Sequence, residues 1–413
     1  MTPSIFISAG EASGEHYGAE LARALSHIFA PKPKTAELWG MGGPQMEAAG
    51  VKIVVRAEDM AVMGLTEVVL HLPRIYREFR KLKRAIRANP PTVAILIDFP
   101  EINFRLAREF HRLGVPVIYF VSPQLWAWKQ HRIELVRKYV RRMLVIFPFE
   151  ESYYRDRGVA AEFVGHPLAD LPQPSITREQ FAAEYHLDPE RTWIGLLPGS
   201  RMKEIESNLP EMLSAATLLG DKYEYILPLA PTLTASQRNA VQRIADDHRS
   251  NLEIRLIGDS GAEGAVSPTA GGALFHARAS IVASGTATVE AALVGNPFVV
   301  VYRVSPLTYA LAKRMVKVPH VAMANLIAQK RVVPELIQHD FTAANIVQHL
   351  EPLLPDGPAR QSMTIELKAV RQALQAGSDN QPRLLAIERV AAIVVQEIEK
   401  TLDSAPPHSA EAP

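Results

Sequence analysis

The residues best suited to chemistry in this sequence lie where an apolar strand gives way to a helix. The run 279–293 reads ASIVASGTATVEAAL, so a strand breaks at Ser284 and Gly285 and a helix begins at Thr286. Such a break points backbone N–H groups out of the carboxyl edge of a sheet, and these groups and the helix dipole favour an anion. Gly285 allows a phosphate to approach closely. Glu290, one turn into the helix, is placed to accept hydrogen bonds from sugar hydroxyls.

A second turn of this kind occurs earlier in the same half, where Gly199, Ser200 and Arg201 follow the apolar run Trp193–Leu197. Two such turns predict a ligand that carries a diphosphate, most economically a nucleotide sugar. The chain has no Asp-x-Asp pair, no His-Glu-x-x-His and no Gly-x-Ser-x-Gly. We therefore expect no metal and no cofactor, because helix N-termini and cations such as Arg201 would stabilise the leaving group. This favours glycosyl transfer over phosphoryl transfer.

Acidic and aromatic residues follow two further apolar runs. Asp98 ends the run TVAILIDFP, and open α/β sheets bind ligands beyond the carboxyl ends of their strands. A partly desolvated carboxylate there is a candidate general base. The alternatives are that Asp98 caps the next helix or pairs with an arginine, and that His16 is the base. Trp126 and Trp128 either line an acceptor pocket or anchor the following helix, and we favour packing.

The N-terminal segment SAGEASGEHYGAEL also crosses from a strand to a helix. Its glycine spacing matches neither the dinucleotide-binding fingerprint nor the P-loop. We expect Ser13, Gly14 and Glu15, at the carboxyl end of the first strand, to contact the ligand. Gly18 is expected to allow close helix packing instead.

The segment Met60–Leu72 is apolar but shorter than the ~20 residues that a membrane-spanning helix needs. The helix predicted after it has an apolar stripe and a basic stripe, a pairing suited to an anionic lipid surface. The alternative is an ordinary core-packed helix with a solvated face. The residues predicted to contact the membrane are Val62, Met63, Leu65, Val68, Val69, Leu72, Arg74, Arg77 and Lys81.

Stepping along the chain, short apolar runs alternate with helical stretches, which indicates βαβ units and parallel sheets. We predict an α/β fold of two Rossmann-like doubly wound domains facing a cleft, with C-terminal helices. The domains are 1–172 (acceptor and membrane side) and 176–345 (donor side), joined by a proline-rich linker. Residues 346–402 are predicted helices, the last crossing back to the first domain, and 403–413 a disordered tail. The predicted strands are Ser4–Ser8, Leu38–Gly40, Thr92–Ile97, Pro116–Val121, Met143–Phe147, Glu162–Val164, Trp193–Leu197, Glu224–Leu229, Glu253–Ile257, Ser280–Ala283 and Pro297–Val301.

The composition is that of an ordinary globular protein. The 413 residues are 47% hydrophobic and 22% charged, with a net charge of +1, which gives no bulk argument for binding nucleic acid. There are no cysteines, which excludes disulfides and thiolate chemistry. The N-terminus lacks a signal-type segment, and no apolar stretch is long enough to span a bilayer. We expect a cytoplasmic protein.

The motifs taken together resemble the lipid-A-disaccharide synthases, bacterial glycosyltransferases of the GT-B type. Ten segments match in order: SAGEASGE, GMGGPQM, AVMGLTEV, IDFPEIN, VSPQLWAWK, FPFE, FVGHPL, LLPGSRMKEI, ASGTATVEA and NLIAQKRVVPELIQ. The resemblance implies transfer of diacylglucosamine from its UDP donor to the 6-hydroxyl of 2,3-diacylglucosamine 1-phosphate. A β-1,6 linkage forms with inversion, and UDP is released. It also implies a homodimer on the cytoplasmic face of the inner membrane, in the lipopolysaccharide pathway.

The resemblance also implies roles for individual residues. Asp98 would deprotonate the acceptor hydroxyl, and Glu290 would bind the ribose. Glu15 stands where the family commonly has aspartate, and Asn325 of NLIA is a further polar residue of the family motif, placed with Ser13 and Gly14 as a substrate contact. The UDP phosphates would be held by Gly199, Ser200, Arg201, Ser284, Gly285 and Thr286. The rival functions are a UDP-sugar epimerase, which needs no acceptor, and a non-catalytic adaptor at a lipid surface.

Overall fold

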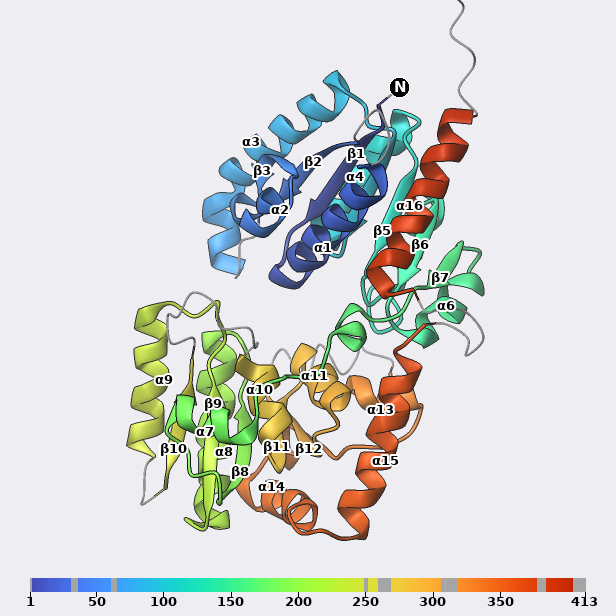
Figure 1. Cartoon of the computed structure of the whole chain (residues 1–413). Coiled ribbons are helices and arrows are strands. Elements are labelled where there is room, and N and C mark those ends of the chain that lie inside the picture. The colour runs from blue at the N-terminus through green and yellow to red at the C-terminus, as the bar shows by residue number, and fades with distance from the viewer. Residues whose placement is uncertain are drawn as a thin grey trace, which may run out of the picture. The chain divides into compact units, whose positions relative to one another are not determined.

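The computed structural model describes residues 2–30, 36–60, 65–248, 252–258, 269–305, 309, 318–376 and 384–403. The chain forms two compact units, one made of Met1–Asp170 and Leu374–Pro413 and the other of Leu171–Ala373. Each unit is built on one parallel sheet with helices packed against it (Figure 1). The predicted fold class, with two doubly wound α/β sheets, is confirmed.

The first unit contains a seven-stranded sheet in the order β3-β2-β1-β4-β5-β6-β7, with parallel pairing throughout. The strand order reverses between β1 and β4, and this switch point is where open α/β sheets bind ligands. The strands are β1 (Ser4–Ala9), β2 (Glu37–Gly42), β3 (Lys52–Arg56), β4 (Val93–Ile97), β5 (Val117–Phe120), β6 (Arg142–Val145) and β7 (Ala161–Phe163). The helices are α1 (Ala12–Phe29), α2 (Pro44–Ala48), α3 (Leu65–Ala88), α4 (Pro100–Arg112), α5 (Ile133–Tyr139), α6 (Pro148–Arg155) and α16 (Ala386–Asp403), with the 3₁₀ turns η1 (Ala57–Asp59), η2 (Gln130–Arg132) and η3 (Pro167–Asp170).

The central strands of this sheet are covered on both faces. Phe6 and Leu96 pack in one core with Leu82 of α3 and Phe110 of α4. Helix α1 packs against β1 and β4, and α16 packs against α1 and β4 (Figure 1). Because both faces of these strands are buried, they read as continuous apolar runs in the sequence.

Helix α16 is fixed to the first unit by apolar and charged contacts. Val390 and Val394 are buried. Glu397 is also buried, and its carboxylate accepts hydrogen bonds from Arg141 Nε at 2.8 Å and Lys400 Nζ at 3.0 Å. Burial acts to raise the pKa of Glu397, but the hydrogen bonds and charges of Lys400 and Arg141 outweigh it and lower that pKa.

The second unit contains a six-stranded sheet in the order β10-β9-β8-β11-β12-β13, with its switch point between β8 and β11. The strands are β8 (Thr192–Leu197), β9 (Tyr223–Pro228), β10 (Ile254–Ile257), β11 (Ala279–Ala283), β12 (Phe298–Tyr302) and β13 (Glu335–Ile337). The helices are α7 (Arg178–Tyr185), α8 (Met202–Leu219), α9 (Ala235–Asp247), α10 (Thr269–His276), α11 (Thr286–Val294), α13 (Met323–Ala328), α14 (Ala343–Leu350) and α15 (Pro358–Ala373), with the 3₁₀ turns η4 (Gln338–Asp340) and η5 (Glu351–Leu353).

Two edge strands, β3 and β13, were not among the predicted strands. An edge strand pairs on one side only, so it does not need a continuous apolar run. Strand β3 begins and ends with the charged residues Lys52 and Arg56, and β13 has three residues. The strands that were predicted are observed, with small differences at their ends.

The chain leaves and re-enters the first unit at adjacent segments. His166 N donates to Leu374 O at 2.8 Å, and Gln375 Nε2 donates to Ala169 O at 3.2 Å. Asp170 Oδ2 accepts a hydrogen bond from the backbone of Ala386, the first residue of α16, at 2.6 Å. The second unit is therefore inserted between two segments that are hydrogen-bonded to each other. Of the predicted tail 403–413, Asp403 is the last residue of α16, and residues 404–413 lie outside the described residues.

Within the described part of the chain, no helix is both long enough and apolar enough to cross a bilayer.

Candidate active site

The turn between β4 and α4 holds Asp98 in an uncommon backbone conformation. Val93–Ile97 is buried throughout, so Asp98 is the first residue beyond the sheet. Asp98 and Phe99 both adopt left-handed φ angles, of 45° and 46°. Such conformations cost about 1–3 kcal/mol each and persist only where the surroundings enforce them.

Hydrogen bonds from three elements enforce this turn. Asp98 O accepts from Asn103 Nδ2 at 2.7 Å and from Tyr119 Oη at 2.6 Å. Asp98 N donates to Phe120 O at 3.0 Å. Asn103 is itself held, because Ser8 Oγ donates to its Oδ1 at 2.7 Å. Residues of β1, α4 and β5 thus fix the backbone that carries the Asp98 carboxylate.

The surroundings of Asp98 also change its acidity. Burial raises the pKa of Asp98 to about 7, with further contributions from the negative charges of Glu11 and Glu101. A backbone hydrogen bond at Phe99 acts in the opposite direction. A carboxylate with a pKa near 7 is suited to accept a proton near neutral pH.

The end of β1 lies directly beside this turn, since Ala9 pairs with Ile97 across the switch point. A Cβ added at Gly10 would lie 2.2 Å from the ring of Phe99, so only glycine allows the ring to pack there. The SAGEASGE segment and the IDFPEIN segment are therefore in contact, as an active site built from both requires.

The three predicted substrate residues of this segment lie in the first turn of α1. Ser13 is exposed, whereas Gly14 is buried against the end of β4. The carboxylate of Glu15 accepts a hydrogen bond from Gln45 N at 2.7 Å and so binds the start of α2. His16 Nδ1 lies 3.4 Å from Gln45 Oε1. Glu15 and His16 thus connect α1 to the GMGGPQM turn.

A buried carboxylate that sequence reasoning missed organises the loop after β5. Glu150 is fully enclosed and accepts hydrogen bonds from Ser122 Oγ at 2.6 Å and Trp126 Nε1 at 3.0 Å. Burial raises the pKa of Glu150 to about 7 despite these bonds. Val121, where the loop begins, has φ of 60°, which is strained for a β-branched residue. The packing interpretation of Trp126 fits its burial, whereas Trp128 is exposed.

In the second unit, the two predicted phosphate turns lie on neighbouring strands. Val282 of β11 pairs with Leu197 of β8, so both turns emerge at the same edge, at the switch point. Gly285, the N-cap of α11, has φ of 151°, and no side chain caps the helix. Gly285 and Thr286 are exposed. The backbone N–H of Ser284 does not point out of the sheet edge as predicted, because it donates a hydrogen bond to Val301 O at 3.0 Å within the sheet.

The turn after β8 already binds a carboxylate of this chain. Gly199 has φ of 124°, a conformation that favours glycine. Glu204 Oε2 accepts a hydrogen bond from Ser200 N at 3.2 Å, and its Oε1 lies 3.3 Å from Arg201 Nη1. An anionic ligand that takes these two groups must displace the Glu204 carboxylate.

Glu290 and Asn325 have different environments in this unit. Glu290, in α11, is half-buried, and burial raises its pKa. Asn325 is completely buried, and its amide bonds Val333 O at 2.9 Å, Glu335 Oε1 at 2.8 Å and two backbone N–H groups. All the hydrogen-bonding groups of an asparagine side chain are then used. In the structure Asn325 therefore fixes the loop before β13, and the expectation that it contacts substrate stays a prediction.

The predicted membrane residues lie in and before α3. Val62 and Met63 lie outside the described residues, and the side chains of Leu65, Val68 and Val69 do as well. Leu72, Arg77 and Lys81 are exposed, and Arg74 is ion-paired with Asp59. Tyr76 and Arg80 are also exposed on this face, whereas the opposite stripe packs into the core of the first unit.

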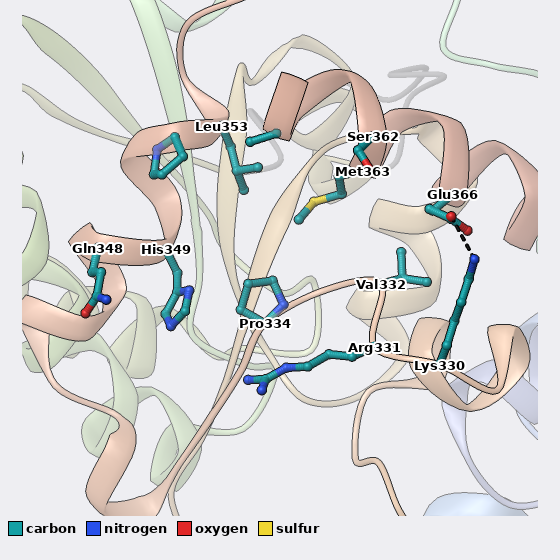
Figure 2. Close-up of a pocket in the computed structure, with 12 residues that line it drawn as sticks. Lys330, Arg331, Val332, Pro334, Gln348, His349, Leu353, Ser362, Met363 and Glu366 are labelled. Atoms are coloured by element: carbon teal, nitrogen blue, oxygen red, sulfur yellow. Dashed lines mark hydrogen bonds and ion pairs between the residues drawn. The ribbon is translucent and has the colours of Figure 1, made fainter. Parts of the chain in front are cut away.

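A separate pocket of about 380 Å³ lies in the second unit beside the edge strand β13 (Figure 2). Pro334 and Met363 line it, with Lys330 and Glu366 paired at 2.7 Å. It contains none of the predicted site residues. Among the residues that the structure describes, no group of three or more His, Cys, Asp or Glu side chains could hold a metal ion.

Among the solved structures with a similar fold, several have titles that name a bound nucleotide. TcCGT1 in complex with UDP matches with a TM-score of 0.62 and 11% identity, covering 97% of this chain and all of that one. UDP-GlcNAc 2-epimerase from Neisseria meningitidis bound to UDP-GlcNAc matches at 0.58 and 12%, with 97% and 100% coverage. The calicheamicin glycosyltransferase CalG4 matches at 0.56 and 16%, with 98% and 100% coverage. At these identities the likeness shows the GT-B fold alone.

Sequence comparison is more specific. A family model described as lipid-A-disaccharide synthetase matches residues 5–388. The lipid-A-disaccharide synthase of Acidobacterium capsulatum is 58% identical over 407 residues, covering 96% of this chain and 97% of that protein. The synthase of Koribacter versatilis is 48% identical, with 95% and 97% coverage. The chain belongs to the lipid-A-disaccharide synthetase family.

Proposed function

We propose that this glycosyltransferase joins UDP-2,3-diacylglucosamine to 2,3-diacylglucosamine 1-phosphate, forming the β-1,6 disaccharide 1-phosphate and UDP. Family membership over nearly the whole chain supports the substrates. The observation that carries the chemistry is Asp98, a carboxylate with a pKa of about 7 on an enforced turn at the switch point of the first unit.

In the proposed reaction, Asp98 accepts the proton of the acceptor 6-hydroxyl as that oxygen attacks C1 of the donor. The attack comes from the face opposite UDP, so the bond from C1 to the diphosphate oxygen breaks and the configuration inverts. The electron pair of that bond leaves with UDP. The proton passes from Asp98 to solvent, which restores the base.

We place the donor at the two turns of the second unit. The amides at Gly285 and Thr286 and the guanidinium of Arg201 would stabilise the charge on the leaving diphosphate. The half-buried carboxylate of Glu290 would accept hydrogen bonds from the ribose. Support comes from the adjacency of the two turns at one sheet edge and the exposure of the glycine and threonine.

A detergent assay with both purified substrates and chelator present tests the function. We expect disaccharide 1-phosphate and UDP in equal amounts without a divalent metal. Asp98→Asn should lower kcat by at least ~10²-fold, because a general base contributes that much, while UDP binding measured by calorimetry stays unchanged. A near-normal rate in this variant would assign the base elsewhere, with His16 the next candidate.

The same assay separates the rival functions. Conversion of a UDP-sugar without any acceptor would indicate an epimerase, for which the support is a likeness of fold at 11–12% identity. An absence of turnover with every substrate would indicate an adaptor.

We further propose that the exposed face of α3 attaches the enzyme to the cytoplasmic side of the inner membrane. Arg77, Arg80 and Lys81 are exposed there together with Leu72 and Tyr76. Each basic residue near an anionic bilayer contributes about 1 kcal/mol. Replacing the three basic residues with glutamine should release the protein from phosphatidylglycerol vesicles in a sedimentation assay. Equal binding to neutral vesicles would contradict an electrostatic attachment.

The family resemblance also leads us to propose a homodimer. Light scattering of the purified protein in detergent measures its mass directly, and a monomer at micromolar concentration would contradict the proposal.

A further inference from the structure

Two cations near the Asp98 turn have no role in the chemistry described so far. Lys129 and Arg132 close the loop that follows β5, and both reach the same oxygen of Glu101 on α4. We propose that Lys129 and Arg132, the cation pair, bind the phosphate of the acceptor and so orient its sugar toward Asp98. This inference rests on the proposed function, which supplies an acceptor with a phosphate monoester.

The fold brings the cation pair close to the catalytic turn. Strands β4 and β5 are neighbours, and Asp98 N bonds Phe120 O at 3.0 Å, so the loop after β5 starts beside Asp98. The loop ends at η2, and Glu101 lies in the first turn of α4, directly after the Asp98 turn. The ion pairs with Glu101 therefore connect the end of the loop to the helix that follows the base.

The backbone around the cation pair is fixed in place. Lys129 has a left-handed φ of 51°, and its carbonyl accepts a hydrogen bond from Arg132 N at 2.9 Å. Gln130 Nε2 donates to Trp126 O at 3.2 Å, and Trp126 is bonded to the buried Glu150. The backbone that carries the two cations is thus fixed without the ligand, which reduces the entropy lost on binding.

Lys129, Arg132 and Glu101 together carry a net positive charge, so the cation pair can bind a second anion. Lys129 Nζ lies 3.7 Å and Arg132 Nη1 3.2 Å from Glu101 Oε1. The Lys129 and Arg132 side chains are 28% and 22% exposed, whereas that of Glu101 is 54% exposed. One carboxylate balances only one of the two positive charges, and it cannot use the eight N–H donors that lysine and arginine offer together. A phosphate monoester supplies both the charge and the acceptors that remain.

The geometry also matches the shape of the acceptor. Its phosphate on C1 and its reacting hydroxyl on C6 lie on either side of the ring oxygen, several bonds apart, so the anion site must lie near the base but not on it. A phosphate bound beside Glu101 meets this condition. Glu101 pairs with both cations, and it is close enough to Asp98 for its charge to contribute to raising the pKa of Asp98. Trp128 adds an exposed aromatic ring, with Lys129 Nζ 4.0 Å from its centre.

Kinetics with two acceptors tests the proposal. The phosphate-bearing acceptor and its dephosphorylated analogue are compared in detergent for the wild type, Lys129→Met, Arg132→Met and the double variant. For the double variant we expect kcat/KM with the phosphate-bearing acceptor to fall ~10–100-fold, since bonds to charged groups are lost. The kcat/KM for the analogue and the KM for the donor should not change. Arg132→Lys should recover part of the loss.

A matched control uses cations of the adjacent helix α5. Arg137 pairs with Glu134, and Lys138 lies 5.6 Å from the ring centre of Tyr139. The double variant Arg137→Met, Lys138→Met removes the same charge and should keep the wild-type preference for the phosphate.

A variant that is expected to bind the acceptor more tightly controls for misfolding. Glu101→Gln removes the carboxylate that competes with phosphate, so we expect the acceptor KM to fall about 2–5-fold. The measurement is made well above pH 7, where Asp98 is ionised in both proteins. A misfolded variant would not bind the acceptor more tightly.

Several outcomes would overturn the proposal. A parallel loss with both acceptors would assign the cation pair a purely structural role, and a wild type that ignores the phosphate would exclude the subsite. Loss of vesicle binding with normal detergent kinetics would assign the pair to lipid headgroups. If the wild type makes no disaccharide from either acceptor, the proposed function itself fails, and this inference fails with it.

Discussion

At the scale of single residues, the ionisation of Asp98 gives the sharpest prediction. A base acts only when unprotonated, and burial raises its pKa to about 7, so kcat/KM should fall as the pH drops through 7. Glu11→Gln removes a negative charge that raises this pKa. The acidic limb of the pH–rate profile should therefore move to lower pH in that variant.

Glu20, in the helix α1 that Glu11 precedes, provides the control. It pairs with Arg23 at the surface, and Glu20→Gln should leave the profile unchanged. If the limb does not move in Glu11→Gln, the profile reports another group and Asp98 is not the titrating base.

Most substitutions in a binding site weaken binding, whereas a substitution of Glu204 should strengthen binding of the donor. Its carboxylate holds Ser200 N and Arg201, the groups proposed for the donor diphosphate. Glu204→Gln should lower the donor KM, because the competing charge is lost. An exposed ion pair contributes at most about 1 kcal/mol, which corresponds to about 5-fold in affinity. Titration with UDP followed by calorimetry measures the change, and weaker binding would mean that Glu204 organises the turn for the ligand.

At the scale of elements, the contact between α16 and the first unit depends on Glu397. Glu397→Gln should lower the unfolding temperature, because buried Glu397 bonds Arg141 and Lys400. We expect a loss of about 1–3 kcal/mol. Its pKa is lowered in the folded state from a usual value of 4.5. The stabilisation is therefore complete above pH 4.5 and is lost as the pH falls through the lower folded pKa.

Thermal unfolding at a series of pH values from 7 downward tests this prediction. The difference between the wild type and the variant should be largest at neutral pH and should shrink below pH 4.5. A constant difference across this range would mean that packing, and not the charge of Glu397, fixes the helix.

Some elements of the fold could be predicted from the sequence, whereas some contacts between elements could not. The central strands and the Asp98 turn follow from apolar runs that end at a polar residue, and such runs are visible in one dimension. The cluster of Glu150 with Ser122 and Trp126 joins residues more than 20 positions apart, so local spacing does not reveal it. Asn325 illustrates the converse, since a motif residue of α13 that suggests a ligand contact uses its amide to bond the loop that follows the helix.

At the scale of the whole molecule, the second unit is one continuous segment, whereas the first needs two. We expect residues 171–373 expressed alone to fold and to bind UDP, because their sheet and switch point are complete. Residues 1–170 alone should be unstable, since the partners of α16 become exposed. Circular dichroism and calorimetry measure both, and a stable 1–170 fragment would contradict the role given to α16.

A joined variant provides the positive control. Residues 1–170 connected to 374–403 by a short flexible linker should regain a cooperative melt, because His166 and Leu374 are hydrogen-bonded in the intact chain. If it does not, the second unit contributes to the stability of the first.

The return of α16 has a consequence during synthesis. Protein domains generally fold in the order in which the ribosome delivers them, but here the segment made first lacks its covering helix until the whole second unit has been translated. The later half is therefore expected to be finished before the earlier one. A premature stop just before residue 386 would then damage the unit whose first segment had been translated earliest.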